Sequence, residues 1–257
     1  MSKIISGDLL PNRNFNSIQD ERAEHKAKLA SAFRVFAHYG FDEGIAGHIT
    51  VRDPEFPETF WVNPFGVYFG SICVSDLIRV DMLGNIVEGK YQRLNRAAFV
   101  IHSSIHKTRS DINAVAHSHS IYGRAFSATG RILRPITIEA TPFYKDHVLF
   151  SAAGGVVNEV EEGEIVARHL GQHKAMILRN HGLLTVGKSV DEAAWWFIAM
   201  ERSCQSQLLA ESVGEPVEMS DEDAQRGYEE LGTSDAGWFQ YQPLFQMVMR
   251  EQPDCLG

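Results

Sequence analysis

Apolar residues recur about every three to four positions in several stretches of the chain, which is the spacing of a helix with one buried face. Leu29 and Phe33 belong to such a stretch, and Gly40 follows it as a stop signal. Ser189 and Glu192 have the spacing of a capping box just before the longest helical pattern. We expect helices over residues 20–39, 95–107, 121–128, 162–170 and 193–210, and an acidic helix after residue 221.

Short apolar runs bounded by Gly, Pro and Asn predict strands. The expected strands cover residues 49–51, 60–62, 77–81, 86–87, 114–120, 175–178 and 183–186, whereas 132–160 should hold loops and short strands. Because strands alternate with helices but hairpins are included, we expect an α/β protein with a mixed sheet flanked by helices. One core can serve a chain of 257 residues. We therefore predict a loose arm over 1–19 and a single domain over 20–257 with a helical tail.

The strand that begins at Ala114 ends in the sequence His-Ser-His. Side chains on a strand alternate between its faces, so His117 and His119 should project together, with Ser118 turned away. His181 follows another apolar run far downstream and is the candidate for a third ligand. Three neutral imidazoles with an open fourth position form the arrangement of catalytic zinc, and imidazole also suits iron and other divalent ions. We therefore predict one divalent metal ion, either Zn, Mn or Fe.

The other histidines are weaker candidates. His102 and His106 have the spacing of a zinc-binding helix, but residue 103 is Ser where such helices carry a Glu base. We therefore expect this pair to pack or to titrate on a helix face. His48 and His147 are expected in loops, where each either lines a cavity or bonds to the backbone.

The amino-acid composition limits the classes of function that we expect. The net charge of -9 argues against binding to nucleic acid or to an anionic membrane, which needs clustered Lys and Arg. The chain has three cysteines and no C-x-x-C motif, which fits a reducing compartment. The N-terminus lacks the apolar core of a signal peptide, and no run approaches the roughly 20 apolar residues of a membrane span. We expect a cytoplasmic protein.

Four motifs together resemble the class II aldolase/adducin superfamily. They are Gly47–Val51, Asn63–Gly66, Ala114–Ser120 and Asn180–Leu183. The resemblance implies a three-layer α/β/α sandwich with a mostly antiparallel sheet. It also implies that His117, His119 and His181 bind the metal, and that the protein is a homotetramer with active sites where two subunits meet.

The chain departs from the sugar-phosphate aldolases of this superfamily at the positions that do their chemistry. Ala98 stands where those enzymes carry a Glu acid/base, and alanine cannot move a proton. His48, Phe65, Arg96 and Ala97 replace the small polar residues that cradle the phosphate. Such a pocket better suits a flat carboxylate, held by His48, Arg96 and the metal, with Phe65 as an apolar wall.

The pattern is similar to an aromatic-acid branch that includes a 4-decarboxylase of 3-hydroxy-2-methylpyridine-4,5-dicarboxylate. A related branch holds iron-dependent enzymes that oxidatively shorten hydroxyaryl acids. We therefore expect a metal-dependent lyase that decarboxylates a hydroxylated aromatic or heteroaromatic acid, a small-molecule carboxylate. Decarboxylation needs a proton donor at its end, and the candidates are His147, Tyr144 and Glu139. The alternatives are an aldolase acting on a non-phosphorylated hydroxy-keto substrate, a mononuclear Fe(II) oxygenase and, least favoured, an adducin-like interaction protein without chemistry.

Overall fold

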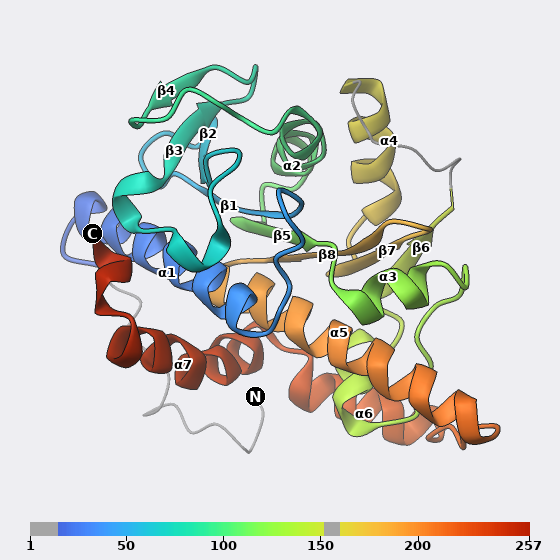
Figure 1. Ribbon diagram of the computed structural model, residues 1–257. Coiled ribbons are helices and arrows are strands. Elements are labelled where there is room, and N and C mark those ends of the chain that lie inside the picture. The colour runs from blue at the N-terminus through green and yellow to red at the C-terminus, as the bar shows by residue number, and fades with distance from the viewer. Residues whose placement is uncertain (1–14, 152–159) are drawn as a thin grey trace.

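The computed structural model describes residues 15–151 and 160–257, without the side chains of residues 97, 98 and 160 (Figure 1). Most of the predicted arm, including residues 1–14, and Gly154 and Gly155 lie outside the described residues. The helices are α1 (Ile18–His38), α2 (Arg96–Thr108), α3 (Ile121–Ser127), α4 (Val160–Leu170), α5 (Val190–Val213), α6 (Asp221–Leu231) and α7 (Ser234–Glu251), with short 3-10 turns at Phe69–Ser71, Val74–Asp76, Ile138–Phe143 and Pro253–Leu256. No helix in these two described ranges is both long and apolar enough to cross a membrane.

The strands form one eight-stranded sheet with the order β4-β3-β2-β1-β5-β8-β7-β6. They are β1 (His48–Arg52), β2 (Thr59–Val62), β3 (Ile78–Asp81), β4 (Ile86–Glu88), β5 (Ala114–Ser118), β6 (His147–Phe150), β7 (Ala175–Leu178) and β8 (Gly182–Gly187). Every pairing is antiparallel except that of β6 with β7. The prediction of a mixed, mostly antiparallel sheet is therefore confirmed.

Helices cover both faces of the sheet, which makes the predicted three-layer sandwich. In Figure 1, α2 and α4 lie on one side of the sheet, whereas α1 and α5 lie on the other, with α6 and α7 outside them. Alternation along β5 sorts its side chains between the two layers. Ala114 and Ala116 pack toward α1 and α5, and Val115 packs toward α2 and α4. Whether a residue has an odd or an even position along a strand therefore decides which helical layer its side chain faces.

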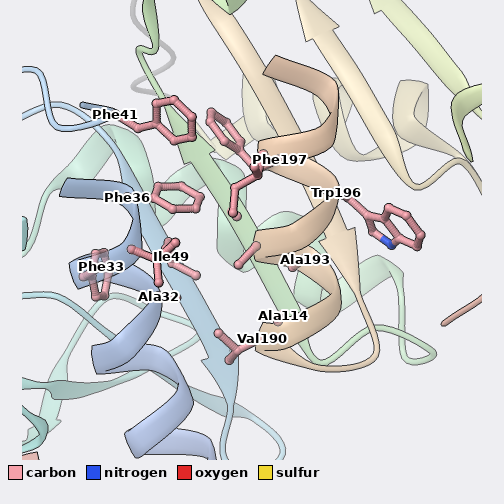
Figure 2. Packing of buried hydrophobic residues seen from close by; sticks show 14 of the residues in the cluster. Ala32, Phe33, Phe36, Phe41, Ile49, Ala114, Val190, Ala193, Trp196 and Phe197 are labelled. Carbon is pink, nitrogen blue, oxygen red and sulfur yellow. The ribbon is translucent and has the colours of Figure 1, made fainter. Parts of the chain in front are cut away.

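The larger core lies between the sheet and the pair α1 and α5 (Figure 2). Phe36 of α1 and Phe197 of α5 meet there with ring centroids 4.9 Å apart, and Phe41 contacts both rings. These rings are fully or almost fully buried, so they fix the position of α5 against the sheet. The long helix predicted after Ser189 thus has its capping serine and its buried face as expected.

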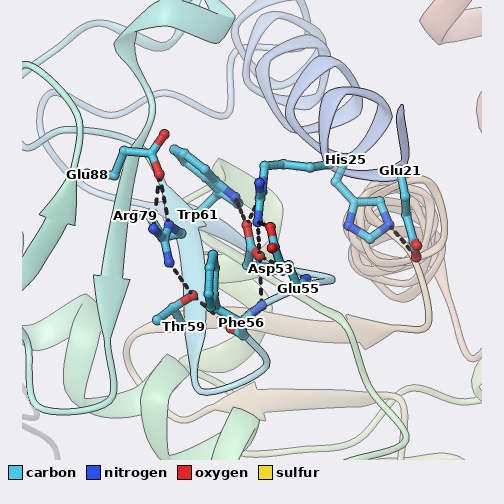
Figure 3. Close-up of polar contacts among 10 residues, drawn as sticks. Glu21, His25, Asp53, Glu55, Phe56, Thr59, Trp61, Arg79 and Glu88 are labelled. Atoms are coloured by element: carbon cyan, nitrogen blue, oxygen red, sulfur yellow. Dashed lines mark hydrogen bonds and ion pairs between the residues drawn. The ribbon is translucent and has the colours of Figure 1, made fainter. Parts of the chain in front are cut away.

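A buried carboxylate fastens α1 to the turn between β1 and β2 (Figure 3). Asp53 accepts hydrogen bonds from the Arg22 guanidinium at 2.7 and 2.8 Å and from the Trp61 indole at 2.8 Å. Burial alone would raise the pKa of Asp53, but these hydrogen bonds and those from two backbone amides lower it to about 2. The carboxylate therefore stays charged, and its neighbours hold the N-terminal half of α1 in place.

Candidate metal centre

The sheet brings the three predicted ligands together at one end. His117 lies in β5, between β1 and β8, opposite His48 on one side and Leu184 on the other. His119 follows directly after the end of β5, and His181 occupies the turn between β7 and β8. The ring centroids of the three histidines are 4.7 to 5.1 Å apart. The fold therefore places His181 beside His117 and His119, although it is distant from them in sequence.

The donor atoms of this cluster fit a metal ion. One ring nitrogen from each histidine lies within 4.8 Å of the others, and the Nε2 atoms of His119 and His181 are 2.9 Å apart. His117 donates its Nδ1 proton to the Leu183 carbonyl at 2.7 Å, so its Nε2 keeps a lone pair for coordination. A backbone carbonyl that holds the outer nitrogen of a ligating histidine is the usual second-sphere arrangement of metal sites.

Electrostatics keeps these imidazoles neutral. Burial lowers the pKa of His117 well below its usual value, and the neighbouring histidines add to the effect. Burial and then the adjacent His119 lower the pKa of His181 to about 4. The pKa of His119 is lowered by burial and next by the charge of Arg124. Because a metal ion binds the neutral imidazole, the cluster is prepared for a divalent cation near neutral pH.

The turn that carries His181 depends on two special backbone conformations. Asn180 has a positive φ of 60°, which asparagine tolerates better than most residues. Gly182 has a φ of 155°, and a Cβ at this position would lie 2.9 Å from the Ser118 carbonyl oxygen. Glycine is therefore needed where β8 approaches the end of β5, and this close approach lets His181 reach the cluster.

His48 lies beside the cluster, on the face of the sheet that α2 covers. It begins β1, so the expectation of a loop position is wrong. Its ring centroid is 5.1 Å from that of His117 and 4.5 Å from that of His102. His48 is only 6% exposed, and neither of its ring nitrogens has a hydrogen-bond partner among the described residues. Two unpaired buried nitrogens next to the histidine cluster are suited to contact a bound molecule.

His102 and His106 form a buried polar unit with Thr50. Both rings bond to the hydroxyl of Thr50, at 2.8 Å from His102 Nδ1 and 2.9 Å from His106 Nε2. A single hydroxyl can donate to only one of them, so the other ring must donate to it. Burial lowers the pKa of both, well below the usual value for His102 and to about 3 for His106. The expected packing role of this pair is confirmed.

Phe65 and Arg96 lie at the same end of the sheet as the cluster. Val62 pairs with Thr50, so the chain after β2 leaves the sheet near the start of β1. The Phe65 amide donates to the Arg93 carbonyl at 3.1 Å, which places the segment before α2 beside this loop. Phe65 is half-buried and Arg96 is exposed. The side chains of Ala97 and Ala98, where the predicted departures from the sugar-phosphate aldolases also fall, lie outside the described residues.

The three predicted proton donors are not beside the cluster of the same chain. His147 begins β6, so its expected loop position is wrong, and it shares the α5 face of the sheet with Leu149. Glu139 belongs to the 3-10 turn Ile138–Phe143, which packs on α5 and α6, and Tyr144 directly follows this turn. The rings of His117 and His119, by contrast, belong to the α2 face. Within one chain, the sheet separates these candidate donors from the three clustered histidines.

His147 also has no free ring nitrogen. Its Nδ1 lies 2.6 Å from the Phe143 carbonyl, and its Nε2 accepts from the Leu133 amide at 2.9 Å. Bonding to the backbone is one of the two roles that the sequence left open for His147. Tyr144 differs, because its buried hydroxyl has no hydrogen-bond partner among the described residues. Both residues line a cavity of about 230 Å³, together with Leu133, Pro135 and Phe143.

Two charged groups near the cluster were missed in the sequence. Arg124 of α3 affects the pKa of His119 and forms an ion pair with Glu43 at 2.9 Å. Glu201 of α5 is only 1% exposed and accepts hydrogen bonds from the segment that follows His119. A signal for Glu201 was present, since a lone acidic residue follows the apolar run 193–200 of the longest predicted helix. The sequence around Arg124 shows no comparable pattern.

Comparison with known proteins agrees with this geometry. The family described as Class II Aldolase and Adducin N-terminal domain matches residues 27–208. Decarboxylase NovR from Streptomyces niveus is 46% identical over 242 residues, which cover 93% of this chain and 89% of the relative. The 4-hydroxy-3-prenylphenylpyruvate oxygenase/4-hydroxy-3-prenylbenzoate synthase of Streptomyces roseochromogenus subsp. oscitans is 44% identical over 241 residues, covering 93% and 87%. A solved structure described as L-fuculose 1-phosphate aldolase from Glaciozyma antarctica PI12 aligns with a TM-score of 0.90 at 43% identity, covering 96% and 97%.

The chain therefore belongs to the class II aldolase and adducin family. The resemblance inferred from the four sequence motifs is confirmed, and so is the fold that it implied. These three relatives carry the names of a decarboxylase, an oxygenase/synthase and an aldolase. Membership in this family agrees with the predicted enzyme class, a metal-dependent lyase of the decarboxylase or aldolase type.

Proposed function

We propose that the protein is a divalent-metal-dependent carbon–carbon lyase that decarboxylates a hydroxylated aromatic or heteroaromatic carboxylic acid. The observation that carries the proposal is the grouping of three neutral imidazoles with His48, whose ring nitrogens lack partners among the described residues. The 46% identity to a protein named a decarboxylase supports the reaction type. The proposal also keeps the predicted cytoplasmic location, which the free thiols of Cys73, Cys204 and Cys255 support.

In this proposal each residue has a distinct task. His117, His119 and His181 hold the divalent ion, either Zn, Mn or Fe. When bound, such an ion supplies a Lewis acid that stabilises negative charge on a substrate oxygen. His48 donates a hydrogen bond to a substrate carboxylate, because it is buried beside His117 and has a free ring nitrogen. Arg96 pairs with a second acidic group, and Phe65 packs on the aromatic ring.

The proton donor comes from a neighbouring subunit in this proposal. Tyr144, His147 and Glu139 face away from the cluster of their own chain, so they serve a site only across an interface. We therefore keep the predicted homotetramer with sites where two subunits meet. Of the three, Tyr144 is best suited as a donor because its hydroxyl is unpaired among the described residues, whereas both nitrogens of His147 are occupied.

A second candidate is a mononuclear Fe(II) oxygenase built on the same histidines. The relative named as an oxygenase, at 44% identity, favours this reading. A third is an aldolase, since a structure described as L-fuculose 1-phosphate aldolase is 43% identical. Replacement of the phosphate-cradling positions by His48, Phe65 and Arg96 argues against a phosphorylated substrate. The non-catalytic, adducin-like alternative gives no reason for a complete ligand set.

One experiment separates these candidates. The purified protein is stripped of metal, reloaded with Zn, Mn or Fe(II), and offered hydroxyaryl and pyridine carboxylic acids beside sugar phosphates. Release of carbon dioxide without oxygen uptake is the expected result for the acids. The variant His119→Ala should lose both bound metal and activity. The variant His38→Ala is the matched control, because this histidine is exposed at the end of α1.

Each outcome decides between two readings. Oxygen consumption that keeps pace with acid turnover would replace the lyase with the oxygenase. Turnover of sugar phosphates alone would overturn the carboxylate substrate. A wild type that binds no divalent ion and turns over none of these compounds would leave the adducin-like reading.

A further inference from the structure

The three ligands of the metal centre are not held equally well by the sheet. His117 is paired on both sides, and its ring is fixed by the Leu183 carbonyl. The turn that carries His181 is closed by the hydrogen bond of its amide to the Leu178 carbonyl at 2.9 Å. His119 lies one residue beyond Ser118, the last residue of β5 that is paired with β8. Sheet pairing therefore does not set the direction of the chain at His119.

The segment after His119 is held by one carboxylate instead. Glu201 accepts hydrogen bonds from the Ser120 hydroxyl at 2.5 Å, the Tyr122 amide at 2.9 Å and the Gly123 amide at 2.6 Å. These donors are the residue before α3 and two amides in the first turn of α3. Because α5 is anchored in the core, a carboxylate on this helix transmits the fixed position of α5 to the turn.

Steric fit at the same place leaves little freedom. A Cβ on Gly123 would lie 2.9 Å from Glu201 Oε2 and 2.7 Å from Leu183 Cγ. The first turn of α3 therefore sits directly against both the carboxylate and β8. A buried carboxylate is costly unless its oxygens are satisfied, and here amide and hydroxyl donors satisfy it at the point where the ligand leaves the sheet.

We infer that Glu201 is a positioning residue for the metal centre: through Ser120, Tyr122 and Gly123 it holds His119 in the place where its Nε2 faces His117 and His181. This inference rests on the proposed metal-binding function and adds a determinant of metal affinity. Outer partners that orient a ligand typically change metal affinity about 10- to 100-fold when removed. We expect a change in this range for Glu201.

The same helix offers a matched control. Glu192 is also buried, at 7% exposure, and its carboxylate also accepts several hydrogen bonds. Its partners are the Lys188 amide at 2.7 Å, the Trp196 indole at 3.2 Å and the Ser234 hydroxyl at 3.1 Å. None of them adjoins a histidine of the cluster. The variant Glu192→Gln therefore removes a buried charge from α5 without touching the turn after His119.

The test measures Co²⁺ and Zn²⁺ binding by calorimetry in the full-length wild type, Glu201→Gln and Glu192→Gln. The visible absorption spectrum of the Co²⁺ complex is recorded as well, because it reports ligand geometry. For Glu201→Gln we expect affinity lowered about 10- to 100-fold and an altered spectrum. For Glu192→Gln we expect wild-type affinity and spectrum, even if its melting temperature falls as much as that of Glu201→Gln.

The outcomes separate this inference from the proposed function. If the wild type binds metal and Glu201→Gln binds it equally well, the positioning role is wrong and the metal centre stands. If both variants lose affinity equally, the effect is general destabilisation and the inference is again wrong. If the wild type binds no divalent ion, the metal centre itself is wrong. Should Glu201→Gln fail to fold, Ser120→Ala removes one of the three hydrogen bonds, and unchanged affinity in that variant would contradict the inference.

Discussion

His106 gives the sharpest test of how burial controls the histidines beside the metal centre. Its ring is buried under Phe60 and bonds through Nε2 to the Thr50 hydroxyl. Burial, followed by the charge of Arg52, lowers its pKa from 6.5 to about 3. We predict that the free energy of unfolding falls less on acidification in the variant His106→Gln than in the wild type. Glutamine is chosen because its amide can still donate to the Thr50 hydroxyl.

The size of this effect follows from proton linkage. Between the unfolded pKa of 6.5 and the native pKa of about 3, the unfolded chain binds one proton more than the folded chain at this residue. The stabilisation is therefore fully present above the unfolded pKa and is lost as the pH falls below it. Between about pH 7.5 and about pH 5, His106 should account for a loss of about 2 kcal/mol.

The assay is urea unfolding of wild type and His106→Gln at these two pH values, with EDTA present and at one protein concentration. Chelation removes the contribution of bound metal to stability. All other titrating groups are common to both proteins, so the difference between their pH dependences isolates His106. Stability of the variant should fall by about 2 kcal/mol less than that of the wild type on acidification. Equal pH dependence in the two proteins would refute the assignment of His106 as a buried neutral histidine.

Three further substitutions test the structural arguments. Thr50→Val keeps the shape of the side chain but leaves two buried imidazoles unsatisfied, and denaturant unfolding should show a loss of about 2 to 4 kcal/mol; no measurable loss would mean that water replaces the hydroxyl. Asp53→Asn leaves the Arg22 guanidinium without its buried charge partner and should cost about 3 kcal/mol in the same assay, whereas a neutral result would contradict the role of this pair. Gly182→Ala forces a Cβ against the Ser118 carbonyl, so we expect about 1 to 3 kcal/mol of destabilisation together with weaker Zn²⁺ binding in calorimetry. Wild-type stability and affinity in that variant would show that the turn can shift without cost.

The histidine pair of the candidate metal centre could be predicted because a local rule decides it. Alternation along a strand places His117 and His119 on one side, and the structure confirms that their rings adjoin. Gly182 follows His181, and its conformation explains how that histidine reaches β5. The helices and strands were predictable for the same reason, since each depends on spacing within a short stretch. The capping serine of α5 is an example.

The catalytic candidates depended on information that spacing does not carry. Tyr144 and His147 lie between His119 and His181 in the sequence, but this position does not tell which face of the sheet a residue covers. That is decided by the pairing of β6 with β7, a parallel pairing between distant segments. His48 was misplaced for a related reason: the Gly-rich turn before it suggested a loop, whereas pairing with β5 extends the strand to include it. Glu201 lies on a helix far from His119 in sequence, and only packing brings the two together.

The distribution of charge around the cluster bears on which substrate the site accepts. Burial lowers the pKa of His48, His102 and His117, so the inner wall consists of neutral imidazoles. The permanently charged side chains lie farther from the cluster. Arg124 is 43% exposed and paired with Glu43, and Arg96 is exposed. A phosphate carries about two negative charges and is best bound by several fixed donors or cations at short range. The carboxylate beside the metal carries about one, which a divalent ion and a neutral hydrogen-bond donor balance, while the second acidic group of the proposed substrate pairs with Arg96 farther out. The inner wall thus favours the proposed carboxylate over a sugar phosphate.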